Sequence, residues 1–292
     1  MPSDRIRVMT FNVRGSFEEK HPERLWKNRA ATNVETIRRH SPDLIGFQEV
    51  ASENRAVYEK ELPGYTHTTG RPTTLSQESR WVTFNPIYWK ADRFTLVDSG
   101  GFFLSPQPDQ WSKGWDAAFV RAATWVRLRS TTTGMDLLHL NTHLDHVGEE
   151  ARQRSTHLII NRLNQLQNDL PLLVSADFNS RAWAPVDEAA IDYPPAVHRD
   201  ALPPGGTVHK LFMQAGFRDT YCEAGNRDHL DMNTFHAFMG GGFPPCALRI
   251  DWILTHDGAR RWHTRDYAII RDHSGRVYPS DHYPVMANLV LE

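Results

Sequence analysis

The sequence predicts a layered α/β protein with mixed or antiparallel sheets. Three observations lead to this prediction: the chain holds many short apolar segments typical of strands, it has two clear amphipathic helices, and helices follow only some of the strands. A strict alternation of strand and helix would instead indicate a parallel sheet. No internal repeat or linker divides the chain, so we expect one domain that spans residues 1–292.

The expected strands are short runs rich in β-branched, aromatic and aliphatic residues. In chain order they are 6–13 ("IRVMTFNV"), 43–50 ("DLIGFQEV"), 85–91, 123–130, 135–144 ("MDLLHLNTHL"), 170–178 ("LPLLVSADF"), 249–256 ("RIDWILTH") and 283–291.

Two helices are expected, over residues 23–39 and 149–168. In each, apolar residues recur at spacings of three and four, as Trp26, Ala30, Val34 and Ile37 do in the first. Two further stretches, 101–116 and the Pro-rich 181–206, read as loops, the second as an insertion beside the end of the 170–178 strand.

Composition excludes some classes of protein. Lys plus Arg (33) nearly balances Asp plus Glu (35), giving a formal net charge of −2, and no basic run indicates a dedicated binder of nucleic acid. Two cysteines are too few for a disulfide framework. The first residues show no signal peptide, and no apolar run reaches the ~18 residues of a membrane span. We therefore expect a cytoplasmic monomer with no membrane span.

Polar residues stand where the apolar strands end. The strand at 170–178 is apolar until it delivers Asp177, and Asn179 follows two residues later. A lone carboxylate at such a place is usually a cap or turn former, but here the pattern recurs along the chain. The residues concerned are Asn12, Glu49, Asn141, His143, Asp145, Asp177, Asn179, Asp251, Asp281 and His282. Because residues i and i+2 of a strand share a face, Asn141 with His143 are expected to point into one cleft.

This collection of polar residues predicts a metal site. Several carboxylates converge with almost no Lys nearby, and such a cluster needs a cation to be tolerable. Oxygen ligands suit Mg²⁺ or Mn²⁺, whereas no spacing typical of a zinc site occurs.

Six motifs occur in order along the chain: "TFNVRG", "DLIGFQEV", "NTHLDHVGEEAR", "SADFNS", "RIDWIL" and "SDHYPV". Together they resemble the endonuclease/exonuclease/phosphatase superfamily. The stretches "DSGGFFLSPQPDQWSKGWDAAFVRAATW" and "TFHAFMG" make its uncharacterised bacterial branch the closest resemblance. The resemblance implies a four-layer α/β sandwich, in which two mixed, mostly antiparallel sheets pack face to face with helices outside.

The resemblance also implies roles for individual residues. Metal contacts would come from Glu49, Asn12 and Asp281. Catalytic roles fall to His143, Asp177, Asn179, Asp251 and His282: Asp177 orients or deprotonates the attacking water, Asn179 contacts the phosphate, and Asp251 pairs with His282. The resemblance implies a phosphate contact for Arg121. Two further substrate contacts are expected from the residues themselves: Asn141, which shares a strand face with His143, and Trp115 in the aromatic loop.

The expected function is divalent-metal-dependent hydrolysis of a phosphodiester or phosphomonoester by an activated water, with a small phosphorylated substrate favoured. One alternative is a nuclease that cuts DNA or RNA, and near-neutral charge argues mildly against it. Another is a binding module that has lost its chemistry. Trp111, Trp115 and Trp183 could stack a base or sugar ring, or could simply pack the outer layers.

Overall fold

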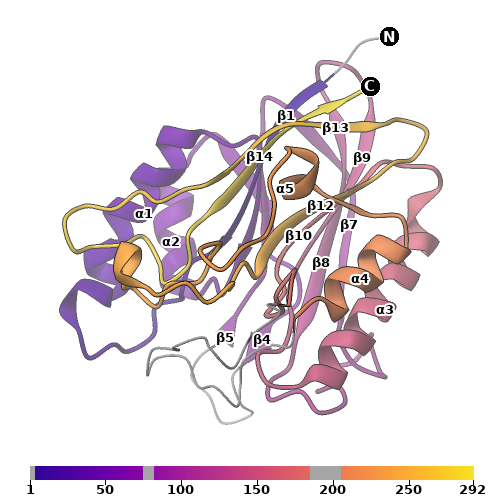
Figure 1. Ribbon diagram of the computed structural model, residues 1–292. Helices are drawn as coiled ribbons and strands as arrows, with labels where there is room; N and C mark the ends of the chain where they lie inside the picture. Colours follow the sequence, from indigo (N-terminus) through magenta and orange to yellow (C-terminus); the bar gives the residue numbers. More distant parts are fainter. Residues whose placement is uncertain (1–3, 75–81, 185–204) are drawn as a thin grey trace.

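The computed structural model describes residues 4–74, 82–184 and 205–292 and forms four layers (Figure 1). The first sheet has the order β13-β14-β1-β2-β6-β3 and the second β11-β12-β10-β9-β8-β7. The strands of the first are β1 (Asp4–Asn12), β2 (Leu44–Gln48), β3 (Tyr65–Thr68), β6 (Ile87–Lys90), β13 (Trp262–Ile269) and β14 (Val285–Leu291). Those of the second are β7 (Phe94–Phe103), β8 (Ala122–Ser130), β9 (Asp136–His143), β10 (Leu172–Asp177), β11 (Arg218–Asp219) and β12 (Asp251–His256).

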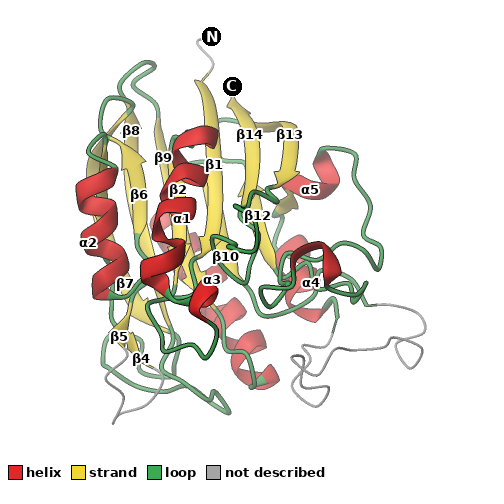
Figure 2. Ribbon diagram, turned by 90° about the vertical axis from the view of Figure 1, so that its left-hand side faces the viewer, coloured by secondary structure: helices red, strands yellow, loops and turns green. Residues whose placement is uncertain are grey.

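Helices cover the outer face of each sheet. α1 (Trp26–His40) and α2 (Ser52–Glu61) lie against the first sheet (Figure 2). α3 (Glu149–Gln167) and α4 (Thr207–Gln214) lie against the second, and the short α5 (Thr220–Glu223) contacts β12 and β13. A small hairpin of β4 (Thr73–Thr74) and β5 (Val82–Thr83) stands apart. The four-layer sandwich and both long helices are thus confirmed.

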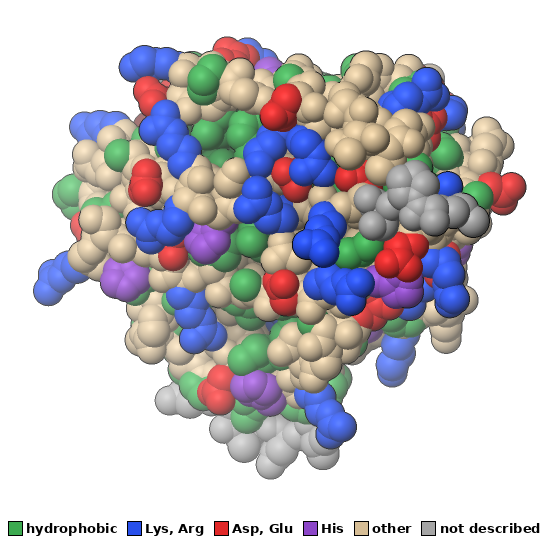
Figure 3. All heavy atoms as spheres, turned by 90° about the horizontal axis from the view of Figure 1, so that it is seen from above, with side chains coloured by type: hydrophobic (Ala, Val, Ile, Leu, Met, Phe, Trp, Pro, Cys, Tyr) green, Lys and Arg blue, Asp and Glu red, His purple; other side chains and the backbone are tan. Residues whose placement is uncertain are grey.

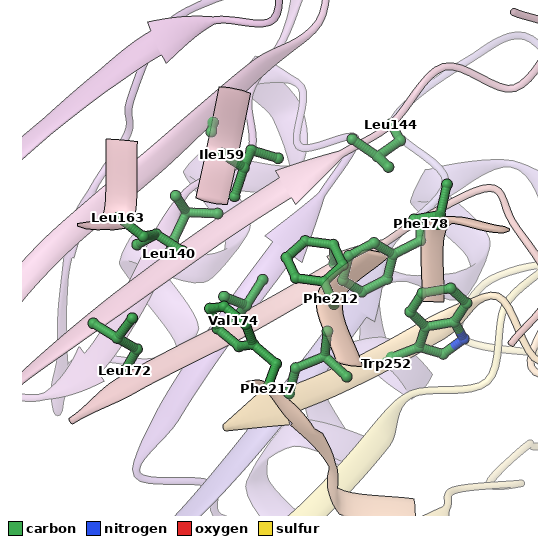
Figure 4. Close-up of a cluster of buried hydrophobic side chains, with 14 of the residues drawn as sticks. Leu140, Leu144, Ile159, Leu163, Leu172, Val174, Phe178, Phe212, Phe217 and Trp252 are labelled. Carbon is green, nitrogen blue, oxygen red and sulfur yellow. The ribbon is translucent and has the colours of Figure 1, made fainter. Parts of the chain in front are cut away.

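Three apolar clusters hold the layers together. Between the sheets, side chains such as Val8 and Leu44 pack against Val126 and Leu173. Under α3 and α4, Ile159 and Phe212 belong to a second cluster with β9, β10 and β12, and the third lies under α1 and α2. The cluster under α3 and α4 consists of apolar side chains (Figure 4). At the end of the molecule where β1 begins, Lys and Arg side chains lie among Asp and Glu on the surface (Figure 3).

One of the two expected loops needs correction, and most of the other lies outside the described residues. The 101–116 loop begins within a strand, since β7 runs to Phe103 before the chain turns. Of the Pro-rich 181–206 stretch, residues 185–204 lie outside the described residues. Within the described part of the chain, no helix is both long and apolar enough to cross a bilayer. That residues 1–292 form one domain stays a prediction.

Candidate active site

The polar residues singled out in the sequence meet at one edge of the two sheets because of strand direction. β1 and β2 run parallel, as do β9 and β10, so the residues that end them share an edge. Asp251 instead begins β12, which runs antiparallel to β10, and Asp281 and His282 precede β14, which runs antiparallel to β1. The prediction that all of them follow carboxyl ends of strands is therefore wrong for these three, which reach the same edge from strands that run the other way.

A histidine between two buried carboxylates forms the centre of the site. His282 Nδ1 lies 2.9 Å from Asp251 Oδ2, and His282 Nε2 lies 3.7 Å from Asp177 Oδ2. Thr234 Oγ1 accepts from the backbone N–H of Asp251 and so fixes the start of β12. Burial and then the Asp251 carboxylate raise the pKa of Asp177 to about 7. Burial alone would lower the pKa of His282, but Asp251 and Asp177 raise it to about 10, so the imidazole is charged at neutral pH.

Glu49 and Asn12 stand beside this centre. Asn12 Nδ2 donates to Glu49 Oε1 at 3.2 Å and to Asp177 Oδ2 at 2.9 Å. Glu49 has a φ of 61°, a strained value that a non-glycine residue keeps only when its surroundings hold it, and such residues gather at functional sites. Among the described residues, nothing hydrogen-bonds Glu49 Oε2, although that oxygen is buried.

His143 and Asn179 line the next part of the edge. Asn179 Nδ2 donates to Leu144 O at 3.0 Å and contacts His143 Nε2 at 2.7 Å. The amide Nδ2 of Asn179 can only donate, so this bond assigns the proton of the neutral ring to Nδ1, 4.0 Å from Glu49 Oε1. His143 Nε2 also lies 3.3 Å from Asp177 Oδ2. Burial, followed by Arg121, lowers the pKa of His143, so this ring is neutral. The backbone N–H of Asn179 donates to Asp177 Oδ1 at 2.9 Å.

Arg14 and Arg121 flank the carboxylates, and the sequence analysis did not identify Arg14. Arg14 Nε lies 3.7 Å from Asp281 Oδ2, and its Nη2 contacts Glu19 at 3.0 Å. Burial would raise the pKa of Asp281, yet Arg14 and neighbouring cations lower it. The sequence analysis expected few Lys residues beside the carboxylates and did not consider Arg, which supplies the cation here. The available signal was position, since Arg14 follows Asn12 by two residues in "TFNVRG".

Arg29 of α1 braces the same region from behind. Its fully buried guanidinium donates to the carbonyls of Val13 and Pro279 at 2.6 Å and 2.9 Å. Arg29 thereby ties the segment after β1 to the segment before Asp281, which fixes Asn12 and Asp281 relative to each other.

Arg121 is held at the site by Asp145. Arg121 Nε lies 3.4 Å from Asp145 Oδ2, its Nη2 lies 3.2 Å from His146 Nδ1, and the residue is only 7% exposed. Asp145 also accepts from backbone N–H groups, those of Ala118 and Gly148 among them. Asp145 is thus a loop-fixing residue, and the contact of Arg121 with a phosphate stays a prediction.

Asn141 does not share the cleft with His143. It lies one rung deeper and is fully buried. Its Nδ2 donates to the carbonyls of Phe47 and Pro86, and its Oδ1 accepts from Gln48 Nε2 and Ser175 Oγ. With every hydrogen-bonding position taken, Asn141 joins the two sheets beneath the site and has no capacity for a substrate, so its expected substrate contact is withdrawn.

Trp115 lies in a loop anchored beside the site. The residue is half-buried and has a φ of 49°. Its neighbour Asp116 accepts from the backbone N–H of Ala151 at the start of α3, at 2.6 Å. Trp111 in the same loop is 41% exposed. A substrate contact by Trp115 stays a prediction.

The sequence profile of the Endonuclease/Exonuclease/phosphatase family matches residues 9–282, a range that includes the whole of this site. The chain belongs to this family. No protein among the curated sequences matches the chain.

Several solved structures have the same fold along nearly their whole length. A family protein from Bacteroides thetaiotaomicron is 26% identical with a TM-score of 0.81, over 100% of both chains. A mannosyl-6-phosphatase from the same species is 26% identical with a TM-score of 0.77, over 97% of this chain and 99% of that one. TDP2 from D. rerio, solved with a single-strand DNA product, is 15% identical with a TM-score of 0.68, over 98% of each chain, and shares the fold.

The members of this family are phosphoester hydrolases that typically depend on a divalent metal, and the site fits such an ion. Glu49 Oε2 is buried without a hydrogen-bond partner among the described residues. A buried carboxylate oxygen without a partner is costly, and a hard cation that prefers oxygen ligands removes that cost. Ligand-capable atoms of Asp177, Asp251 and His282 lie within 4.8 Å of one another. Since the Asp251 bond and the raised pKa keep His282 protonated, these three suit acid–base work better than ligation.

Proposed function

We propose that this protein is a phosphoesterase that uses Mg²⁺ or Mn²⁺ to hydrolyse a small phosphorylated substrate. The observation that carries the proposal is the buried Asp177–His282–Asp251 arrangement beside the unpartnered Oε2 of Glu49. Buried charges of this kind reduce stability unless partners neutralise them, and a cation with a substrate phosphate would do so during turnover.

Glu49 and Asp281 are the residues proposed to hold the metal, with Asn12 orienting the Glu49 carboxylate through its 3.2 Å bond. A bound divalent cation would neutralise charge on the phosphate and lower the pKa of an attacking water. Arg14 keeps Asp281 ionised, as the lowered pKa of that carboxyl indicates, and so keeps its oxygens available as ligands.

Asp177 is the proposed proton acceptor for the attacking water. Asn12 Nδ2 and the backbone N–H of Asn179 hold its two oxygens in place. A general base works best when its pKa lies near the working pH, and burial with the Asp251 charge raises the pKa of Asp177 to about 7. Asp177 therefore has both the orientation and the basicity for this role.

His282, His143 and Arg121 are the proposed donors to the phosphate. The Nδ1–H of His282 donates to Asp251, which leaves its Nε2–H to donate to a phosphoryl oxygen. His143 presents Nδ1–H toward the Glu49 side of the site, and the guanidinium of Arg121 adds positive charge. Such donors, fixed in advance at a buried site, stabilise charge that develops in the transition state.

A compact phosphate ester is the favoured substrate class. The mannosyl-6-phosphatase that is 26% identical over nearly its whole length supports a phosphorylated sugar. Arg121 at the candidate site is largely buried and the formal net charge is −2, and both favour a compact ester over a duplex, which needs an open basic groove along its backbone. Trp115 is proposed to pack against the non-phosphate part of the substrate.

The test is a panel of esters assayed with Mg²⁺ or Mn²⁺, and again after chelation. It contains p-nitrophenyl phosphate, bis(p-nitrophenyl) phosphate, mannose 6-phosphate, glucose 6-phosphate and supercoiled plasmid DNA. Asp177→Asn, which keeps the volume and removes the base, serves as the inactive reference. We expect metal-dependent release of phosphate from a small ester, loss of turnover on chelation, and recovery when the metal is restored.

Two outcomes would contradict the proposal. Plasmid nicking faster than cleavage of any small ester, with a steep salt dependence, would make the protein a nuclease. Activity that survives exhaustive chelation, or that Asp177→Asn leaves unchanged, would remove the proposed metal and base.

A further inference from the structure

A polar groove lies at the end of the first sheet opposite the candidate active site. It encloses about 680 Å³ on β1, β14 and β13, which is within the range of small-molecule sites. Arg5 lines it, whereas Asn12 of the active site ends the same strand seven residues later, roughly 23 Å away at about 3.3 Å per residue. The groove therefore shares no residue with the site described above.

The groove lies on the outer face of the sheet. Ile6 and Leu289 belong to the core between the sheets, so their strand neighbours Arg5, Arg7 and Asn288 point outward. α1 and α2 lie beside this part of the sheet and leave β14 and β13 uncovered (Figure 2). Lys and Arg side chains gather across the middle of the surface seen from this end (Figure 3).

Cations outnumber carboxylates in the groove. Its charged lining consists of Arg5, Arg7, Arg93, Arg265, Asp43 and Asp266. Asp43 is shared by Arg93 at 3.5 Å, Lys90 at 3.1 Å and Arg7 at 3.9 Å, and Arg93 also pairs with Asp4 at 3.0 Å. Asp266 already accepts a hydrogen bond from Asn288.

Two of the arginines have no side-chain partner among the residues that the structure describes. Within residues 4–74, 82–184 and 205–292, the side chains of Arg5 and Arg265 make no hydrogen bond or ion pair. The Nε of Arg93 is buried and is also without a hydrogen-bond partner among the described residues. Guanidinium donors in planar geometry are suited to phosphate oxygens, and those of the exposed Arg5 and Arg265 are available to a ligand.

The sheet register places these cations on two sides of one strand. Arg5 and Arg7 lie opposite Val290 and Asn288 of β14, and β13 lies on the far side of β14. The register of β13 shifts between Thr264 and Asp266, and such a bulge re-aims the side chain at that point, which here is Arg265. Strands are about 4.8 Å apart, so β1 and β13 are separated by about 10 Å.

We propose that this groove is an anion-binding site for a compact ligand that carries two or more phosphate groups. A ligand with several phosphate groups can contact Arg5 and Arg7 on one side and Arg265 on the other at the same time. A single phosphate offers fewer oxygens to share among the three guanidinium groups. The same phosphate chemistry occurs in a nucleic-acid backbone, but a bounded groove with Asp43 and Asp266 in its walls favours the compact form.

The test measures binding of sodium tripolyphosphate by titration calorimetry in buffer with excess EDTA, so that no metal at the active site contributes. The variant is Arg5→Gln/Arg265→Gln. Because neither side chain has a partner among the described residues, the unfolding midpoint should not change. The matched control is Arg154→Gln/Arg276→Gln, which removes two exposed arginines outside the groove.

We expect the groove variant to bind tripolyphosphate at least tenfold more weakly than the wild type. The control variant should bind tripolyphosphate within twofold of the wild type. The wild type should bind orthophosphate at least tenfold more weakly than tripolyphosphate. Equal weakening in both variants would show diffuse charge attraction only and would overturn the proposal. So would a 12-nucleotide single strand that binds tighter than tripolyphosphate and loses affinity in the groove variant, since the ligand would then be nucleic acid.

Discussion

Asp177 and Asp251 are direct partners in the antiparallel register of β10 and β12, so two buried carboxylates meet at one rung of the sheet. This arrangement explains two of the electrostatic effects at the site. Burial and the Asp251 charge raise the pKa of Asp177 to about 7, and both carboxylates together outweigh burial and raise the pKa of His282 to about 10. The pair therefore selects a charged histidine beside a carboxylate of near-neutral pKa.

The Asp251–His282 pair should act as one unit in turnover. His282→Ala and Asp251→Asn are each expected to lower kcat by roughly 10²–10⁴, as the loss of acid–base help usually does. The double variant should then lose little more than the worse single variant, because each change disables the same group. Steady-state kinetics on the best ester of the panel measures this, and multiplicative losses would show two independent roles.

The chain offers a matched control for this experiment. His209 Nε2 lies 2.9 Å from Asp219 Oδ2, so this pair has the same chemistry as Asp251 and His282, and the active-site network does not include it. His209→Ala should leave kcat of the folded protein within about threefold of the wild type.

Glu49 should determine metal affinity. Glu49→Gln removes the charge and keeps the volume, so we expect Mn²⁺ to bind at least tenfold more weakly, because the buried, unpartnered Oε2 is the proposed ligand. Calorimetric titration with Mn²⁺ measures this without a substrate. Glu53→Gln, four residues further along the chain at the exposed start of α2, should bind Mn²⁺ like the wild type. Unchanged affinity in Glu49→Gln would make Glu49 a structural residue.

The sequence predicted the two long helices with regular apolar stripes and missed several shorter or more polar elements, among them α4. α1 and α3 were expected within a few residues of their bounds because their apolar stripes are regular. α2 was missed, since the residues that it buries are Asn54 and Tyr58. β13 was missed because an edge strand with one solvated face reads as polar.

At the site, the sequence predicted the types of residue better than their position relative to the edge of the sheet. The i, i+2 rule correctly places Asn141 and His143 on one face of β9 but says nothing about which rung reaches the edge. His143 ends the strand and lies in the site, whereas Asn141 is one rung inside, saturated by both sheets. Arg14 was missed because its contact with Asp281 joins residues far apart in the sequence.

Asp145 should make stability depend on pH in the acid range. Burial would raise the pKa of Asp145, but Arg121 and three backbone N–H groups lower it to about 2 from an ordinary 3.8. Because the folded-state pKa is the lower one, the carboxylate contributes stability above about pH 4 and loses it as the pH falls toward 2. Linkage puts the contribution at about 2 kcal/mol in full, about 1 kcal/mol of which is lost by pH 3.

Urea unfolding of the wild type and Asp145→Asn at pH 6 and pH 3 measures this contribution. The difference in unfolding free energy between the two proteins should shrink by about 1 kcal/mol at the lower pH. A difference that stays constant would mean that Asp145 titrates alike in the folded and unfolded chains.

Asn141 should prove essential for stability and dispensable for substrate binding. Its amide joins the sheets through the carbonyls of Phe47 and Pro86 and through Gln48 Nε2, which also donates to Thr10 Oγ1. The contact leaves no room for a side chain at position 46, because a Cβ on Gly46 would collide with Ser175 Oγ and the Asn141 amide.

Asn141→Ala leaves several buried groups unpartnered at about 1–3 kcal/mol each, so we expect a loss of at least about 3 kcal/mol in the free energy of unfolding. The exposed Asn164→Ala on α3 should change it by less than about 0.5 kcal/mol. KM of the folded Asn141→Ala protein, measured well below its unfolding midpoint, should stay within about twofold of the wild type. A large rise in KM with an unchanged unfolding midpoint would instead return Asn141 to the substrate contacts.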